Sequence, residues 1–66
     1  MEYFDYESMA RKARISTDHL NALRGQIRQE FPQDDMMYEL HLMRACMAIE
    51  EGHATIEEAL RSEKAA

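Results

Sequence analysis

The stretch MARKARISTDHLNAL (residues 9–23) decides the fold, because it contains the end of one helix and the start of the next. Apolar residues and alanines recur at helical spacing on both sides of its middle, and Ser16 or Thr17 is a suitable N-cap between them. The pattern predicts a short helix from about Asp5 to Ala13 and a second helix that begins at Ser16 or Thr17. The stretch therefore predicts two helices joined by a tight corner.

Signals further along the chain set the limits of the second and third helices. Pro32 ends the second helix, because proline lacks a backbone N–H and disfavours a helical conformation in the residue before it. Asp34 or Asp35 begins a third helix, and Gly52 ends it. The apolar stripe of the second helix is Leu20, Leu23, Ile27 and Phe31.

A last helix follows a capping box, in which Thr55 is followed three residues later by Glu58. We expect residues 61–66 to fray as a tail. The sequence shows no β alternation, and a chain of 66 residues is long enough for one domain with a small core. The prediction is a single all-α domain over residues 1–66, a bundle of four short helices with a helix-turn-helix-like corner.

The third helix carries two apolar stripes on nearly opposite sides, where a helix at the surface of a monomer needs one. The stripes are Met36, Leu40, Met43 and Met47 on one side, and Tyr38, Leu42, Ala45 and Ile49 on the other. Because the remaining helices are too short to cover both, we predict a homodimer with the Tyr38 stripe as its interface. The alternative is a self-sufficient monomeric bundle.

The acidic residues are concentrated in the second half of the chain. The net charge is −5, and residues 1–31 are neutral, with five acids and five bases, whereas the remainder holds eight acids and three bases. Such a chain binds phosphate backbones poorly and suits a protein partner with a basic surface, although ordinary solubility also explains the charge. We predict that the partner contacts Met43, Met47, Glu50 and Glu51.

Residues 9–28 resemble a helix-turn-helix motif, which gives a second interpretation. In it, DNA would be contacted by Arg11, Lys12, Thr17, Asn21, Arg24 and Arg28. Two residues argue against DNA binding: Arg14 lies where the turn usually has glycine, and Asp18 would face the phosphates. The favoured function is therefore a small acidic regulator, adaptor or inhibitor that binds a protein. The alternative is a DNA-binding transcriptional regulator that dimerises through its third helix.

Residues with catalytic or metal-binding chemistry are few and poorly placed. The single cysteine, Cys46, cannot form an internal disulfide and suits a reducing compartment. His41 lies five residues away on a different face of the helix, so the two cannot act as base and nucleophile. Glu50 and His53 form a Glu-x-x-His pair without the further carboxylates of a di-iron site. We expect a cytoplasmic protein that is not an enzyme, with no cofactor, metal or membrane span.

Overall fold

The structure, a computed structural model, describes the backbone of residues 3–65 and the side chains of residues 3–61. Within that range the chain forms four helices and no strand. They are α1 (Tyr6–Lys12), α2 (Thr17–Glu30), α3 (Asp35–Glu50) and α4 (Ile56–Ala65). The prediction of an all-α chain of four short helices is confirmed for the described residues.

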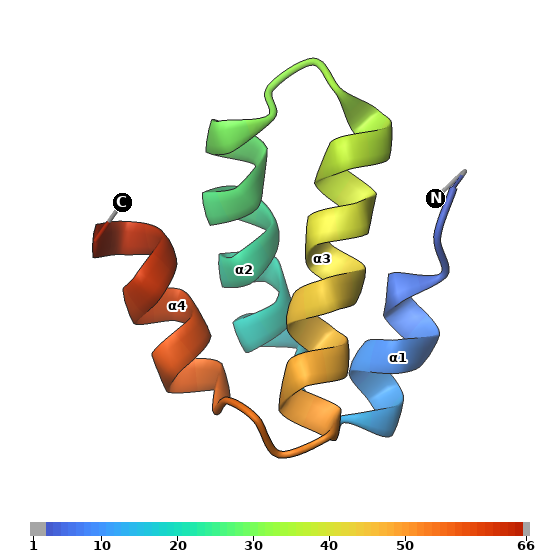
Figure 1. Cartoon of the computed structure of the whole chain (residues 1–66), viewed down its shortest axis with the longest axis vertical. Helices are drawn as coiled ribbons and strands as arrows, with labels where there is room; N and C mark the ends of the chain where they lie inside the picture. Colours follow the sequence, from blue (N-terminus) through green and yellow to red (C-terminus); the bar gives the residue numbers. More distant parts are fainter. Residues whose placement is uncertain (1–2, 66) are drawn as a thin grey trace.

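The helices run alternately down and up, and their order in space differs from their order in the chain (Figure 1). The helix α3 lies between α1 and α2, while α4 packs on the other side of α2. Each of the two central helices therefore has a neighbour on both sides. The outer helices α1 and α4 each pack mainly against one partner.

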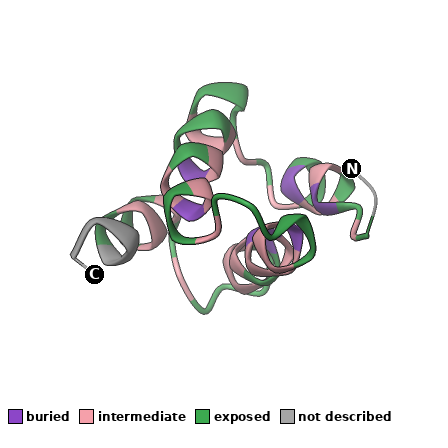
Figure 2. Cartoon of the chain, turned by 90° about the horizontal axis from the view of Figure 1, so that it is seen from above, coloured by how far each residue is buried: buried purple, intermediate pink, exposed green. Residues whose placement is uncertain are grey.

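The core lies where α1, α2 and α3 face one another (Figure 2). Its central cluster is Tyr6, Leu23, Ile27 and Leu42. The helix α4 adds Ile56, Ala59 and Leu60, which are partly buried against this cluster. The apolar stripe predicted for α2 is confirmed, since Leu23 and Ile27 are buried and Leu20 and Phe31 pack beside them.

Side-chain caps begin each helix, and those of α2, α3 and α4 are among the residues that the sequence predicts. The cap side chains are Asp5 for α1, Ser16 for α2, Asp34 for α3 and Thr55 for α4. The Thr55 hydroxyl accepts the Glu58 N–H at 3.1 Å, and a Glu58 carboxylate oxygen accepts the Thr55 N–H at 2.9 Å. This is the predicted capping box, with both backbone donors satisfied.

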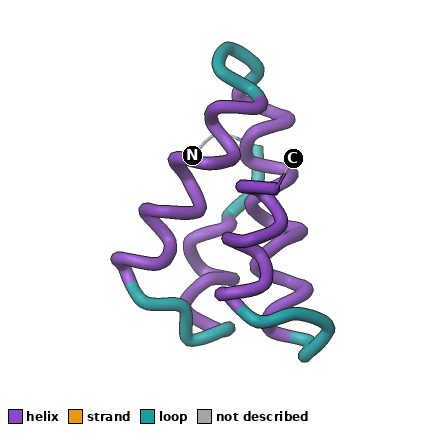
Figure 3. The backbone as a smooth tube through the Cα atoms, turned by 90° about the vertical axis from the view of Figure 1, so that its left-hand side faces the viewer, coloured by secondary structure: helices purple, strands orange, loops and turns teal. Residues whose placement is uncertain are grey.

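The connections from α1 to α2 and from α3 to α4 lie at the same end of the bundle (Figure 3). Arg14, just after α1, is left-handed with φ of 61°, as expected for its place in the turn. Its N–H donates to the Arg11 carbonyl at 3.0 Å, and the Ile15 N–H donates to the Ala10 carbonyl at 3.0 Å. This pair of hydrogen bonds is a Schellman motif, which satisfies carbonyls at the helix end.

The end of α3 has the same pair of hydrogen bonds around a glycine. Gly52 has φ of 83°, its N–H donates to the Ile49 carbonyl at 3.2 Å, and the His53 N–H donates to the Ala48 carbonyl at 2.8 Å. The predicted role of Gly52 in ending the third helix is confirmed. The α4 backbone extends to Ala65, past the point where we expected a frayed tail to begin. Ala66 lies outside the described residues.

The structure also shows which stripe of α3 faces its own chain. Leu42 is fully buried, and Tyr38 and Ala45 pack against the core cluster. Leu42 is therefore enclosed within its own chain, where we expected it at a dimer interface. On the opposite stripe Met36 and Met47 remain 47% and 39% exposed. Leu42 is buried and the methionines are exposed because α1 and α2 both pack on the Tyr38 side of α3.

A buried carboxylate, which the sequence analysis missed, holds the segment before α1. Glu39 on α3 is 5% exposed, and its Oε1 accepts the backbone N–H groups of Tyr3 at 2.9 Å and Phe4 at 3.0 Å. Glu39 shares a helical face with the buried residues Leu42 and Cys46, three and seven positions later. That spacing was the available signal of its burial.

Candidate functional site

An apolar seam on α3, here called the Met-rich face, is formed by Met36, Leu40, Met43 and Met47. Its spacings of four, three and four residues match the a and d positions of a heptad repeat. Met36 and Met47 at the two ends are exposed, whereas Leu40 and Met43 between them are half-buried. The two most exposed residues of the face, Met36 and Met47, therefore lie about three helical turns apart.

Exposed acidic residues lie around the junction of α3 and α4. This acidic junction consists of Glu50, Glu51, Glu57 and Glu58. Glu58 is engaged in the capping box, and Glu51 lies 3.5 Å from His53 Nε2. Glu50 forms no hydrogen bond or ion pair with the described residues. Because Glu50 and Glu51 follow Met47 by three and four positions, the helix places all three side by side.

The structure places the predicted DNA contact Arg24 in a network between α1 and α2. Its guanidinium donates to Tyr6 Oη at 3.1 Å, to Asn21 Oδ1 at 2.9 Å and to a Glu7 carboxylate oxygen. The guanidinium carbon lies 5.4 Å from the centre of the Tyr6 ring. Burial works to lower the pKa of Arg24, but the hydrogen bond to Tyr6 and the charges nearby outweigh it, so its pKa is raised. Arg24 therefore joins two helices of its own chain.

Arg28, another predicted DNA contact, is held in a similar way between α2 and α3. It donates to Asp35 Oδ1 at 2.9 Å and to the Phe31 carbonyl at 3.2 Å, and its guanidinium stacks 3.6 Å from the Tyr38 ring centre. Burial raises the pKa of Tyr38, and the electrostatic interaction and hydrogen bond with Tyr6 raise it further. Two of the six predicted DNA contacts thus have intramolecular partners for their charge.

The other predicted DNA contacts are more accessible. Lys12, Thr17 and Asn21 are exposed, although Asn21 already accepts a hydrogen bond from Arg24. Arg11 is exposed and donates to the Ser8 hydroxyl at 3.0 Å. Hydrogen bonds from Ser8, with a smaller effect of Arg11, lower the pKa of Asp5. Among the predicted DNA contacts, the accessible cations therefore lie on α1 rather than on α2.

Cys46 and His41 both pack inside the chain. Cys46 is fully buried, and burial raises the pKa of its thiol to about 11. The His41 ring packs on Phe31 with 4.6 Å between ring centres. In residues 3–61 no group of three His, Cys, Asp or Glu side chains is placed to hold a metal ion. Over the same range no helix has the length and apolar character needed to cross a membrane.

No known protein family, curated protein sequence or solved structure matches this chain. We therefore infer a function from the side chains that the chain exposes. The two surfaces to weigh are the Met-rich face with its acidic junction, and the cations on α1.

Proposed function

We propose that the protein is a small non-enzymatic adaptor or inhibitor that binds a helix of a protein partner on the Met-rich face and the adjoining acidic junction. The observation that carries this proposal is the exposure of Met36 and Met47, 47% and 39%, at the two ends of one heptad seam. Solvent-exposed methionines that lie in register with two half-buried apolar residues form a continuous apolar strip. Such a strip suits a second helix with the same repeat.

The residue types on the face also favour a protein ligand. Methionine is flexible and polarisable, so it adapts to the side chains of different partners. Met43 packs partly on the core cluster, which anchors the seam to the fold. A partner helix would therefore contact a supported surface instead of mobile side chains alone.

The acidic junction supports the choice of a basic partner helix. Glu50 and Glu51 lie at the C-terminal end of α3, where a negative charge interacts unfavourably with the helix dipole. Glu51 has His53 nearby, but Glu50 has no described partner. Lys or Arg side chains that flank the apolar seam of a partner would neutralise both. Charges at the rim of an interface chiefly raise the association rate and select the partner.

A second copy of this chain fits the apolar seam but not the charges. In an antiparallel pair, Met36 of one copy faces Met47 of the other, so the apolar spacing is self-complementary. The same pairing brings Glu50 and Glu51 towards Asp34 of the second copy, next to Asp35 with its Arg28 ion pair, and a parallel pairing brings like acids together. We therefore favour a basic partner over the homodimer on this face.

DNA binding has less support as a second function. Arg24 and Arg28 are bonded within the chain, and the net charge is −5. A DNA ligand would have to compete with Glu7 and Asp35 for these two guanidinium groups.

The proposal is tested with two designed helical peptides that share a leucine a/d seam and differ in flanking Lys or Glu residues. We expect the Lys-flanked peptide to bind at least about ten-fold more tightly than the Glu-flanked one, with an association rate that falls as salt rises. Met47→Asp should weaken binding about ten-fold or more, because it places a carboxylate within the apolar seam. Surface plasmon resonance measures the association rate, the dissociation rate and the affinity.

Charge-reversed variants locate the binding surface. Glu50→Lys with Glu51→Lys should slow association of the Lys-flanked peptide about ten-fold and flatten its salt dependence. The matched control is Asp18→Lys with Glu30→Lys on α2, which changes the net charge by the same amount. Equal slowing by both double variants would contradict the proposal. A dimer mass by light scattering that Met47→Asp converts to a monomer would also contradict it, because a second copy would then occupy the face.

A further inference from the structure

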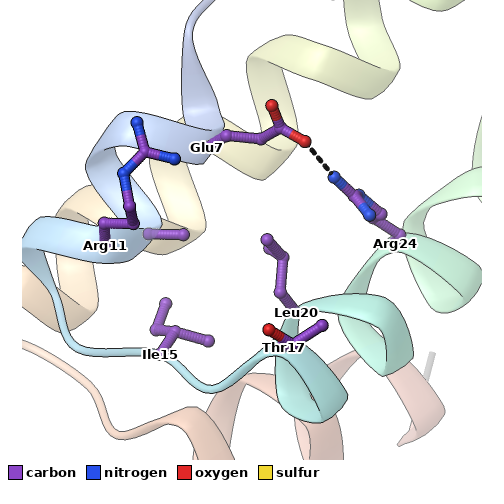
Figure 4. A pocket seen from close by; sticks show the side chains of 7 residues that line it. Glu7, Arg11, Ile15, Thr17, Leu20 and Arg24 are labelled. Carbon is purple, nitrogen blue, oxygen red and sulfur yellow. Dashed lines mark hydrogen bonds and ion pairs between the residues drawn. The ribbon is translucent and has the colours of Figure 1, made fainter.

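A pocket of about 290 Å³ lies between α1 and α2 (Figure 4), and no α3 residue lines it. Its apolar base is formed by Ala10 on α1, Ile15 in the turn and Leu20 on α2. Ala10 is 1% exposed, whereas Ile15 and Leu20 are half-buried. The pocket therefore offers a small preformed apolar surface that is separate from the Met-rich face.

The pocket lies where α1 and α2 both pack on α3, and one of its α1 lining residues, Ala10, is small. The single methyl group of Ala10 leaves space that a larger residue would fill. The left-handed turn at Arg14 is followed by Ile15, which lines this space. Across the pocket, the ion pair of Glu7 with Arg24 joins the two helices and limits its size (Figure 4).

The charges around the pocket favour an anionic group. Glu7 and Arg24 neutralise each other, which leaves Arg11 as the remaining charged lining residue. Arg11 donates to Ser8 and forms no ion pair with the described residues. Lys12 and Arg14 follow it, so three cations occur within four positions of an otherwise acidic chain. A guanidinium fits a carboxylate with two parallel hydrogen bonds, which favours a carboxylate over a bulkier anion in a pocket of this size.

We propose that this pocket binds an aliphatic carboxylate of the size of one leucine residue, with the aliphatic group on the apolar base and the carboxylate on Arg11. Thr17, an exposed residue of the lining, supplies a hydroxyl that would hydrogen-bond an amide next to the carboxylate. The volume, about 290 Å³, is close to the lower end of the range of about 300–1,000 Å³ for ligand pockets, which matches a group of this size. The C-terminal residue of a polypeptide and a free branched acid share this chemistry.

The test is a titration of the ¹⁵N-labelled chain, followed by amide chemical shifts. N-acetyl-leucine should shift the amides of Ile15, Thr17 and Leu20 and saturate with a dissociation constant on the order of 1 mM. N-acetyl-leucinamide lacks the carboxylate and N-acetylglycine lacks the aliphatic group, so each should bind at least about ten-fold more weakly. The acid 4-methylpentanoate identifies the source: weaker binding than N-acetyl-leucine indicates a peptide C-terminus, and equal binding indicates a free acid.

Arg11→Gln should weaken N-acetyl-leucine binding about ten-fold. The matched control is Lys12→Gln, which removes the same charge from the next exposed position, outside the pocket lining. Amide spectra of both variants without ligand verify the fold. Equal affinities for the two variants, shifts that do not saturate, or equal binding of N-acetyl-leucinamide would overturn the proposal. Failure here leaves the peptide experiments on the Met-rich face unaffected, because the two surfaces share no residue.

Discussion

The corner after α1 and the junction after α3 have the same backbone design but differ in the residue at its most constrained position. Both contain a left-handed residue, a Schellman pair of hydrogen bonds and then a Ser or Thr that caps the next helix. The left-handed residue is Arg14 in the first case and Gly52 in the second. A residue with a side chain pays about 1–2 kcal/mol for this conformation, whereas glycine does not.

The surroundings of the two positions explain why one tolerates an arginine. At the first corner, Arg24 joins α2 to Glu7 and Tyr6 on α1, so contacts outside the turn hold the two helices together. The second junction is open to solvent, with no atom within 4 Å of a Cβ placed on Gly52. The left-handed residue is thus an arginine at the corner that the Arg24 network spans, and a glycine at the junction where no such network is present among the described residues.

The largest effect is expected when the support of the first corner is removed. Arg24→Met keeps the apolar stem but removes the hydrogen bonds to Tyr6, Glu7 and Asn21. Because the side chain is 30% exposed, solvent screens part of this interaction, and we expect a loss of about 2 kcal/mol in the free energy of unfolding. Urea denaturation followed by circular dichroism measures the change.

Arg44→Met is the control for Arg24→Met, because Arg44 is exposed and forms no hydrogen bond or ion pair with the described residues. For this control we expect a loss of less than about 0.5 kcal/mol in the free energy of unfolding. If the two variants lose the same stability, the Arg24 network does not support the first corner, and the comparison fails.

A smaller loss is expected at the second junction. Gly52→Ala imposes the cost of a left-handed alanine but reduces the entropy of the unfolded chain, for a net destabilisation of about 1 kcal/mol. The open space around Gly52 means that this cost comes from the backbone and not from a clash. Thermal unfolding should show a lower Tm than the wild type. An unchanged Tm would show that α4 does not need this turn for its packing on α2.

The sequence was sufficient to predict the features that depend on neighbouring residues. Ser16, Pro32, Gly52 and the pairing of Thr55 with Glu58 each set a helix limit through a short-range interaction, and the structure has all of these limits. Arg14 was also identified as a constrained position, because the turn usually has glycine there and a side chain disfavours the left-handed conformation.

Features that depend on packing between helices could not be predicted in the same way. The two stripes of α3 are similarly apolar, so periodicity does not tell which one α1 and α2 cover. In the structure, Leu42 lies in the core and Glu39 lies beneath the segment before α1, and these two contacts identify the covered side of α3. Arg24 has the residue type of a DNA contact, and its intramolecular role depends on Tyr6 and Glu7, more than 16 positions away.

The smallest change in the free energy of unfolding is expected from relieving the strain at the first corner, and the sign of this change is informative. Arg14→Gly removes the cost of a left-handed side chain, about 1–2 kcal/mol, but glycine gives the unfolded chain more freedom, which costs about 0.4–1 kcal/mol. We expect a net stabilisation of about 0.5 kcal/mol, opposite in sign to Gly52→Ala.

Arg14→Ala is the control, because it removes the exposed side chain but keeps the strain, so it should leave the stability nearly unchanged. A destabilised Arg14→Gly variant with a neutral Arg14→Ala would mean that the backbone at this corner is not strained, and that the difference between the two junctions has another cause. The same substitution in the Arg24→Met background sharpens the result: if the network holds the corner in its strained form, the stabilisation by Arg14→Gly should change when the network is absent, as a double-mutant cycle measures.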